Sequence, residues 1–242
     1  MDKVLDWFCR LSLIAFVLVL FSSFAGDMIF KFQHAFPKAN STNEQNFNIT
    51  EEPIIKKLSG RKFVELDYDN IVYVVNLQAK YSMAGMVVAR NDNFWLRNIM
   101  RTEFDEISPL DLALAWGDIT KNRQINKYWK FKSKKTLIQT RELESNLIKK
   151  DNMPWKKSYV LDHVSHIHTI PVNSNVMGAL LKLKKDDTVK LNGFLVDVYS
   201  KSLDPIAMTK LPNIETDNKS RNIQTSEIFL IKQVQIGQNV YK

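Results

Sequence analysis

Three of the four histidines in this chain lie within six positions, in the stretch "LDHVSHIHTIP" from Leu161 to Pro171. In an extended segment His166 and His168 point to one face and His163 to the other, because side chains alternate along a strand. Two imidazoles on one face can share a zinc or copper ion, with a third ligand from Asp162 or from a carboxylate distant in sequence. The alternative is structural, with one imidazole binding a loop carbonyl and the others lining a polar strand edge. The spacing therefore makes His163, His166 and His168 candidate metal ligands.

A second cluster mixes positive charge with aromatic rings in "KYWKFKSKK", from Lys127 to Lys135. Basic grooves with exposed aromatic side chains bind single-stranded nucleic acid through phosphate contacts and base stacking. The alternation of this stretch predicts a half-buried strand, with Lys130 and Lys132 on the face opposite to Trp129 and Phe131. A solvated lysine face, within reach of anionic lipid head groups, is therefore favoured over a nucleic-acid site.

Other patterns of catalytic residues do not occur in the sequence. The only cysteine is Cys9, so the chain beyond it has no thiolate for nucleophilic catalysis or zinc binding. There is no glycine-rich phosphate loop or nucleophile elbow, and no pair of carboxylates has a spacing typical of acid–base catalysis. Asp197 falls in the apolar half of a predicted strand, where it needs a partner such as an indole N–H or His168. We therefore expect a binding protein rather than an enzyme.

The N-terminal region contains sixteen uncharged residues, Leu11 to Gly26. As a helix they span about 24 Å, somewhat less than a hydrocarbon core of about 30 Å. We expect a transmembrane anchor within residues 1–30; the small residues around Ser23 and Ala25 leave a cleaved signal peptide as the alternative. A short N-terminus normally stays in the cytoplasm, which exports the remainder. The prediction is a single-pass protein of the bacterial inner membrane whose C-terminal domain is periplasmic.

Composition separates a polar tether, residues 31–60, from a β-rich α/β domain over residues 61–242. The tether contains "PKANSTNEQNFNITEEP", which has no apolar periodicity. Apolar residues make up 45% of the 242-residue chain, enough for a packed core, and the formal net charge of +8 favours anionic surroundings. We therefore expect one soluble domain held close to a membrane.

The first half of this domain is predicted to contain a long strand and a short helix. Residues 71–90 are rich in β-branched and aromatic side chains, which indicates one long bent strand or two paired strands. Gly85 then marks a bulge or a close approach of two backbones. The stretch "ISPLDLALAWGD" predicts a buried helix with Ser108 as its N-cap and Gly117 at its end.

The second half carries the clearest periodicity. A helix is predicted to begin at Asn173 or Ser174, and a turn at Asp186-Asp187 leads into a strand over residues 188–199. A final strand over residues 225–236 would close the sheet. A tight acidic turn that leads into an apolar strand with Gly193 at a kink is typical of small coiled barrels of the OB or SH3-like kind. The predicted fold class is therefore α/β (α+β), an N-terminal transmembrane helix plus one barrel domain with a few short helices.

The order of "SPLDLALAWGDI", "YWKFK", "HIHTIPVNSNVMGALLKLKKDDTVKLNGFLVDV" and "SEIFLIKQV" resembles a family of uncharacterised bacterial inner-membrane-anchored proteins. Residues 108–117 are similar to that family's "SPxDLALGWG" helix, and residues 168–196 to its "HxIP" and "GDxVxLxGxLV" elements. Only His168 matches the family's histidine, because the family has Asn at the position of His166. The resemblance covers roughly residues 81–235 and implies a membrane-anchored topology, but no activity.

These features predict a membrane-anchored periplasmic binding or assembly module, within an envelope or secretion-type complex of protein partners. Leu11 to Gly26 would hold it in the bilayer. The first alternative is a metal-binding protein or metal-dependent enzyme that uses His163, His166 and His168. The second alternative is a nucleic-acid-binding envelope protein that uses the Lys127–Lys135 strand.

Overall fold

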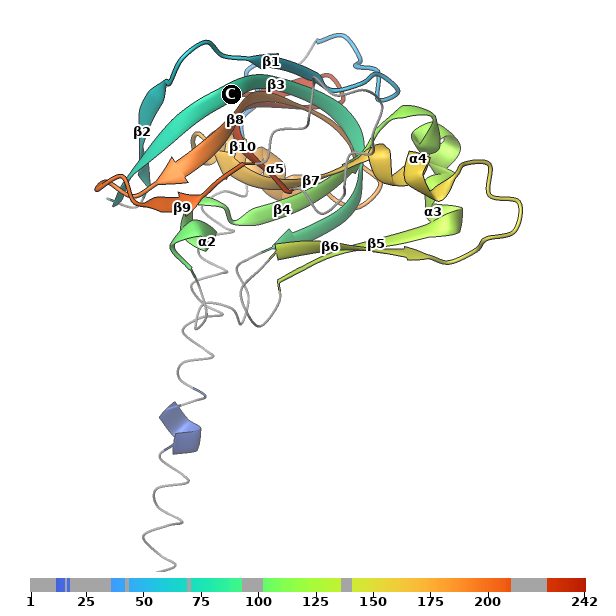
Figure 1. Cartoon of the computed structure of the whole chain (residues 1–242), viewed down its shortest axis with the longest axis horizontal. Coiled ribbons are helices and arrows are strands. Elements are labelled where there is room, and N and C mark those ends of the chain that lie inside the picture. The colour runs from blue at the N-terminus through green and yellow to red at the C-terminus, as the bar shows by residue number, and fades with distance from the viewer. Residues whose placement is uncertain are drawn as a thin grey trace, which may run out of the picture.

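The structure is a computed structural model in which a strand-rich α/β body carries nearly all of the described residues (Figure 1). The described residues are 12–15, 17, 36–41, 44–68, 71–92, 102–135, 141–209 and 226–242. Within these ranges no helix has both the length and the apolarity needed to cross a membrane. Most of the expected anchor, Leu11 to Gly26, lies outside the described residues, and its described positions, 12–15 and 17, are helical.

Apart from the helical positions 12–15 and 17, eleven strands and five short helices are described within these ranges. The strands are β1 (Ile54–Lys57), β2 (Phe63–Tyr68), β3 (Ile71–Asp92), β4 (Leu110–Ala115), β5 (Trp129–Lys135), β6 (Arg141–Leu147), β7 (Val164–Pro171), β8 (Thr188–Tyr199), β9 (Pro205–Ala207), β10 (Ser226–Ile236) and β11 (Asn239–Tyr241). The helices are α2 (Glu103–Ile107), the 3-10 helix η2 (Gly117–Arg123), α3 (Ile125–Tyr128), α4 (Lys157–Asp162) and α5 (Ser174–Lys182).

Five of the strands form a closed circuit. β3 pairs with β4, β4 with β7, β7 with β10, β10 with β8, and β8 pairs again with β3. Only the β7–β10 pair is parallel; the other four are antiparallel. Each strand of the circuit therefore has a hydrogen-bonded neighbour on both sides, which removes the exposed edges of an open sheet.

The long strand β3 bends around the circuit as one continuous element, the first of the two arrangements predicted for residues 71–90. Its register shifts between Leu77 and Ala79 against β8, and between Val87 and Ala89 against β4. An extra residue in one strand bends it and increases its twist. Gly85 lies between these two irregularities, at a close backbone approach, because a Cβ atom there would lie 2.8 Å from the Ala115 carbonyl oxygen.

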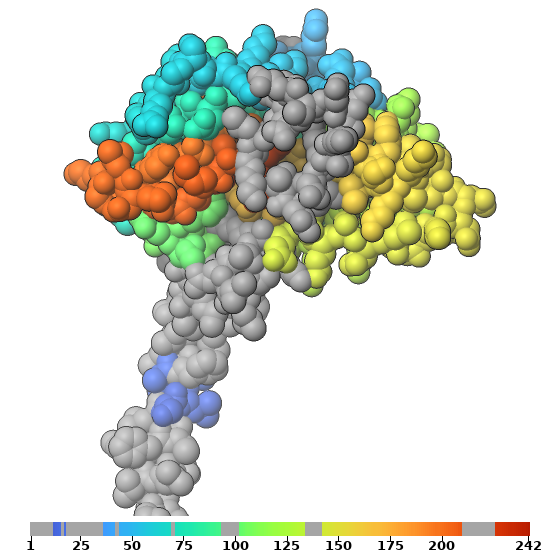
Figure 2. All heavy atoms as spheres, viewed as in Figure 1, coloured from blue at the N-terminus to red at the C-terminus, as the bar shows by residue number. Residues whose placement is uncertain are grey.

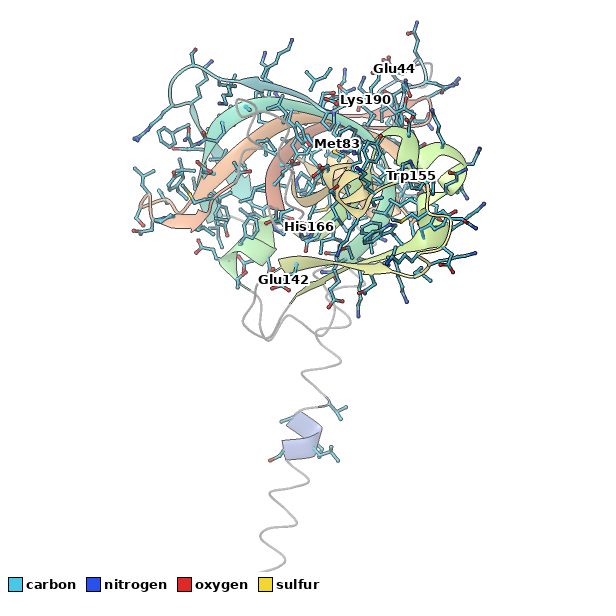
Figure 3. The ribbon with its side chains drawn as sticks, turned by 45° about the vertical axis from the view of Figure 1, so that its right-hand side comes forward. Glu44, Met83, Glu142, Trp155, His166 and Lys190 are labelled. Carbon is cyan, nitrogen blue, oxygen red and sulfur yellow. The ribbon has the colours of Figure 1, made fainter. Side chains whose placement is uncertain are left out.

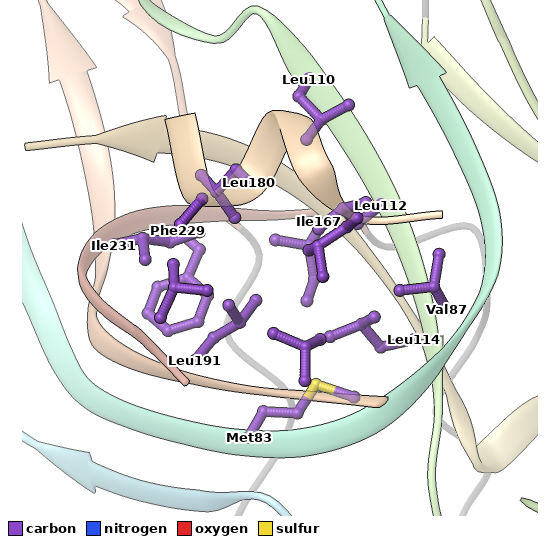
Figure 4. Packing of buried hydrophobic residues seen from close by; sticks show 14 of the residues in the cluster. Met83, Val87, Leu110, Leu112, Leu114, Ile167, Leu180, Leu191, Phe229 and Ile231 are labelled. Atoms are coloured by element: carbon purple, nitrogen blue, oxygen red, sulfur yellow. The ribbon is translucent and has the colours of Figure 1, made fainter. Parts of the chain in front are cut away.

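Alternate residues of the five strands fill the interior of the circuit, and α5 closes one end of it (Figure 4). Leu180 of α5 packs in the same cluster as Ile167, Leu191 and Phe229. Full burial of each such side chain contributes about 1.5–3 kcal/mol. The predicted N-cap is present, because the Asn173 side chain accepts a hydrogen bond of 2.9 Å from the backbone N–H of Val176. The predicted strand over residues 188–199 is also confirmed as β8.

The predicted helix over Ser108 to Gly117 is wrong, because Leu110–Ala115 forms the central strand β4. Ser108 instead ends α2, where its backbone N–H donates to the Phe104 carbonyl. Leucine occupies every second position of "LDLALA", and Leu110, Leu112 and Leu114 all point into the barrel core. Burial of that period-two pattern between β3 and β7 outweighs the helical propensity of Leu and Ala.

The body also begins earlier than the predicted boundary at residue 61. Strand β1 lies within the expected tether, residues 31–60, and pairs with β3. Ser41 forms a bridge with Val240, and the Gly117 backbone N–H donates to the Ile49 carbonyl at 2.9 Å. Several backbone groups of this polar stretch are therefore hydrogen-bonded along the barrel rather than to solvent.

Candidate functional site

A buried carboxylate–imidazole hydrogen bond connects two neighbouring strands of the barrel. Asp111 on β4 lies directly opposite His168 on β7, and Asp111 Oδ1 is 2.8 Å from His168 Nδ1. Asp111 is 0% exposed and His168 is 5% exposed. Both side chains point away from the barrel core, since the leucines that alternate with Asp111 point into it. A buried carboxylate is costly unless it is paired, and the hydrogen bond with the imidazole offsets part of that cost.

His166 extends this pair into a cluster. It shares the face of His168, with ring centroids 4.9 Å apart at an interplanar angle of 69°. Its Nε2 lies 3.3 Å from the Ser133 hydroxyl oxygen on β5, and the side chain is 2% exposed. Figure 3 shows His166 between the barrel wall and the β5–β6 hairpin, which closes over it. The opposing β4 residue is Ala113, whose small side chain leaves room for the two rings.

The three side chains have a composition that suits a transition metal. One ligand atom from each of Asp111, His166 and His168 lies within 4.8 Å of the others. Imidazole nitrogens and one carboxylate oxygen are ordinary ligands of zinc. The predicted third ligand from a distant carboxylate is thus available, since Asp111 lies 57 residues from His168. This composition makes the group a candidate site for a metal ion, and in the structure Asp111 and His168 are joined by a hydrogen bond.

His163 lies apart from this cluster. It follows α4 as its C-cap, one residue before β7 begins, so strand alternation does not position it. Its ring contacts two tilted aromatic rings, that of Tyr159 at a centroid distance of 4.0 Å and that of Trp116 at 4.2 Å. Its Nδ1 lies 2.7 Å from the Tyr159 carbonyl oxygen. Gly117 leaves space for the ring, because a Cβ atom there would lie 2.6 Å from it.

A pocket of about 690 Å³ opens beside His168, between α2 and the turn that leads into β9. Figure 2 shows the β9 segment, in orange, directly above the α2 segment, in green. The ring of Phe104 meets His168 edge-on, at a centroid distance of 5.7 Å. The described lining residues are Thr102, Glu103, Phe104, His168, Ser200, Ser202, Asp204, Pro205, Ile206 and Ser226.

Short hydrogen bonds hold the far wall of this pocket in place. The Ser202 hydroxyl donates to Asp204 Oδ2 at 2.6 Å, and its oxygen lies 2.9 Å from that of Ser200. On the opposite wall, Thr102 and Asp105 form a capping box that begins α2. Both walls are therefore ordered by their own contacts, so the polar groups of the pocket are positioned in advance.

The predicted lysine strand is present as β5, and its two faces are as expected. Trp129 and Phe131 are 1% and 6% exposed and pack on the barrel, whereas Lys130 and Lys132 are exposed. Lys132 lies directly opposite Glu144 on β6. The exposed face of the hairpin thus carries charges of both signs, and the aromatic rings lie on the opposite, buried face. A surface that stacks nucleic-acid bases has exposed aromatic rings instead.

Asp197 on β8 is also buried, but its partners differ from those expected. Its side chain accepts hydrogen bonds from the Gln78 amide and, at 2.9 Å, from the backbone N–H of Thr209, and not from an indole or His168. Burial raises the pKa of Asp197, and the hydrogen bonds from Thr209 and Gln78 partly oppose that increase. Gln78 is the extra residue of the first irregularity in β3, a position that periodicity does not reveal.

Comparison of the chain with protein-family models, curated proteins and solved structures finds no match. Its function must therefore be inferred from the geometry. The sequence alone indicated two of the three cluster residues, His166 and His168, but not Asp111 or Ser133. Asp111 was recognisable in principle, because it is the one polar residue of "LDLALA" once that stretch is taken as a strand.

Proposed function

We propose that this chain is a membrane-tethered binding or assembly module built on an OB-type barrel. Numbered along the chain, β3, β4, β7, β8 and β10 are strands one to five, and the circuit runs 1-2-3-5-4. The third and fifth strands are parallel, and α5 lies between the third and fourth. This closed five-stranded arrangement supports the OB assignment over an SH3-like one.

The position of the pocket beside His168 is the observation that carries this proposal. OB-type barrels bind ligands on the face of strands two and three, between the loop from strand one to two and the loop from strand four to five. Here α2 lies in the first of these loops, β9 in the second, and His168 on the third strand. The pocket therefore lies where such a barrel recognises its ligand.

The pocket lining favours a polypeptide partner with polar or cationic side chains. Glu103 and Asp204 contribute carboxylates, and four of the described lining residues carry hydroxyl groups. The described part of the lining contains no lysine or arginine. Such a surface repels the phosphates of nucleic acid, so the nucleic-acid function proposed for the Lys127–Lys135 strand receives no support from it.

The membrane location remains part of the proposal and depends on the sequence. The apolar stretch Leu11 to Gly26 favours an anchor in the bacterial inner membrane with the barrel in the periplasm. A tethered barrel would then meet partners within an envelope complex.

A substitution that fills the pocket tests the proposal. Ser202 lies on the exposed rim of the pocket, so Ser202→Trp is expected to obstruct it without altering the barrel core. Complexes of the full chain, solubilised in mild detergent from its own membranes, are expected to decrease in size on native gels. Lys130→Trp, on the exposed face of β5, is the matched control and should leave the complex intact. Unchanged complexes in Ser202→Trp, with normal circular dichroism, would exclude the pocket as the binding site.

A second candidate function, metal binding, is favoured by the buried cluster of Asp111, His166 and His168. Two imidazoles and one carboxylate suit zinc or copper and leave a position for water or a ligand. Metal ligation requires an ionised carboxylate and neutral imidazoles, so metal affinity should fall as the pH is lowered.

Metal content and metal-dependent stability test this second candidate. Full chain purified without chelator or a polyhistidine tag is expected to contain close to one metal ion, or to gain thermal stability with micromolar zinc. His166→Ala should abolish the response, whereas His163→Gln, outside the cluster, should retain it. Protein that is metal-free and insensitive to zinc and copper would refute metal binding and leave the pocket proposal unaffected.

A further inference from the structure

A second pocket, of about 670 Å³, lies over the wall formed by β1, β3, β8 and β10. It is distinct from the pocket beside His168, because no described residue lines both. Three lysines from three different strands border it: Lys56 on β1, Lys80 on β3 and Lys232 on β10. Positive charge is therefore concentrated here by strand pairing rather than by a run of lysines in the sequence.

The register places two of these lysines side by side. Lys56 lies directly opposite Lys80 in the antiparallel β1–β3 pair, so both side chains share one face. Like charges in directly opposite positions of a sheet are destabilising. On its other side, Lys80 lies opposite Phe194 of β8. Lys232 comes from the irregular position of β10, and its Nζ lies 5.8 Å from the centre of the Phe194 ring.

The described lining contains no aspartate or glutamate side chain that would offset this charge. Asn173, the N-cap of the nine-residue helix α5, borders the pocket, so the positive end of that helix adds to the potential. The side chain of Asn192 is held by the Ser82 hydroxyl, which donates to it at 2.7 Å. Lys242, at the end of the sequence, also lines the pocket, but the inference does not depend on it.

We infer that this pocket binds the phosphate group of a small ligand, either a soluble phosphate ester or a lipid head group. The lysines supply charge for the phosphate oxygens, and Phe194 supplies a flat apolar surface for the part of the ligand next to the phosphate. A bound anion would also relieve the repulsion between Lys56 and Lys80, which links binding to stability.

Inorganic phosphate is the first probe. The full chain in detergent is expected to gain thermal stability with phosphate, relative to chloride at equal ionic strength. Lys80→Gln and Lys232→Gln should each weaken phosphate binding about fivefold, as expected for the loss of one exposed charge contact. Lys130→Gln, an exposed lysine on β5, is the matched control and should bind phosphate like the unchanged protein. Without phosphate, Lys80→Gln should be more stable than the unchanged protein, because it removes the like-charge pair.

The two sources of phosphate are distinguished in nanodiscs. If the ligand is a lipid head group, the stabilisation by added phosphate should be smaller in discs that contain phosphatidylglycerol than in discs of phosphatidylcholine alone. If it is a soluble ester, added phosphate should stabilise the protein equally in both. The inference fails if phosphate stabilises the protein no more than chloride does, or if all three lysine variants lose the response equally. Because this pocket and the one beside His168 have separate linings, that failure would not bear on the proposed function.

Discussion

Closure of the barrel between β8 and β10 is tested by a single added methyl group at Gly193. A Cβ atom at this position would lie 2.0 Å from the Leu230 carbonyl oxygen and 3.0 Å from the Phe229 ring. The strands must therefore separate in Gly193→Ala. Overpacking costs about 1–3 kcal/mol, and each weakened ladder hydrogen bond costs about 1 kcal/mol more. We expect a loss of about 3–5 kcal/mol, a large share of a typical stability of about 5–15 kcal/mol.

Urea unfolding followed by tryptophan fluorescence measures this loss, because Trp116 and Trp129 are buried. Gly60→Ala is the matched control: Gly60 has φ +72° but no atom within 4 Å of the added carbon. Its cost should be about 1 kcal/mol, from backbone strain alone. Gly85→Ala, whose Cβ would lie 2.8 Å from a carbonyl oxygen, should fall between the two. If Gly193→Ala costs no more than Gly60→Ala, β8 does not contact β10 as described and the circuit is not closed.

Three further predictions concern the buried polar and aromatic side chains. His168→Ala should cost about 3 kcal/mol in urea unfolding, because it removes the imidazole partner of the buried Asp111, and adding Asp111→Ala should restore part of that loss. Asp197→Asn should gain stability relative to the unchanged protein as the pH rises from about 4. The raised pKa of Asp197 means that folding favours the protonated carboxyl, so the unchanged protein loses stability when this carboxyl ionises and the Asn variant does not. Unfolding curves at several pH values measure the difference in stability, and a difference that does not change with pH would contradict the prediction. Trp129→Ala should lower the free energy of unfolding by about 3–5 kcal/mol, because the indole is 1% exposed and anchors the β5–β6 hairpin. A loss below about 1 kcal/mol would show that the hairpin is not packed on the barrel at this position.

Sequence reasoning succeeded where one local signal decided the structure. The Asn173 cap, the acidic turn and the alternation after Thr188 predicted where α5 begins and both bounds of β8. It failed for Leu110–Ala115, where a serine, a proline and helix-forming residues gave a helical start signal. Only the neighbouring strands β3 and β7, distant in sequence, make that stretch a strand, and tertiary burial of this kind is not visible locally.

The same reasoning explains what could be predicted of the candidate site. Alternation along β7 correctly grouped His166 with His168, since both lie in one strand. His163 lies outside the cluster that the structure brings together, because α4 ends at Asp162 and the strand alternation does not extend to it. Asp111 was missed because the pairing of β4 with β7, which places it opposite His168, depends on the whole barrel. The pocket beside His168 likewise depends on α2 and β9, which lie about one hundred residues apart in the chain.

Site-specific photo-crosslinking in the native membrane tests most directly whether the pocket beside His168 is the binding site. A benzophenone amino acid is placed at Ile206, which lines the pocket, or at Leu147, an exposed apolar residue at the end of β6. The account predicts one discrete adduct from Ile206, none from Leu147, and loss of the Ile206 adduct when Ser202→Trp is added. Equal adducts from both positions, or an adduct from Leu147 alone, would contradict it.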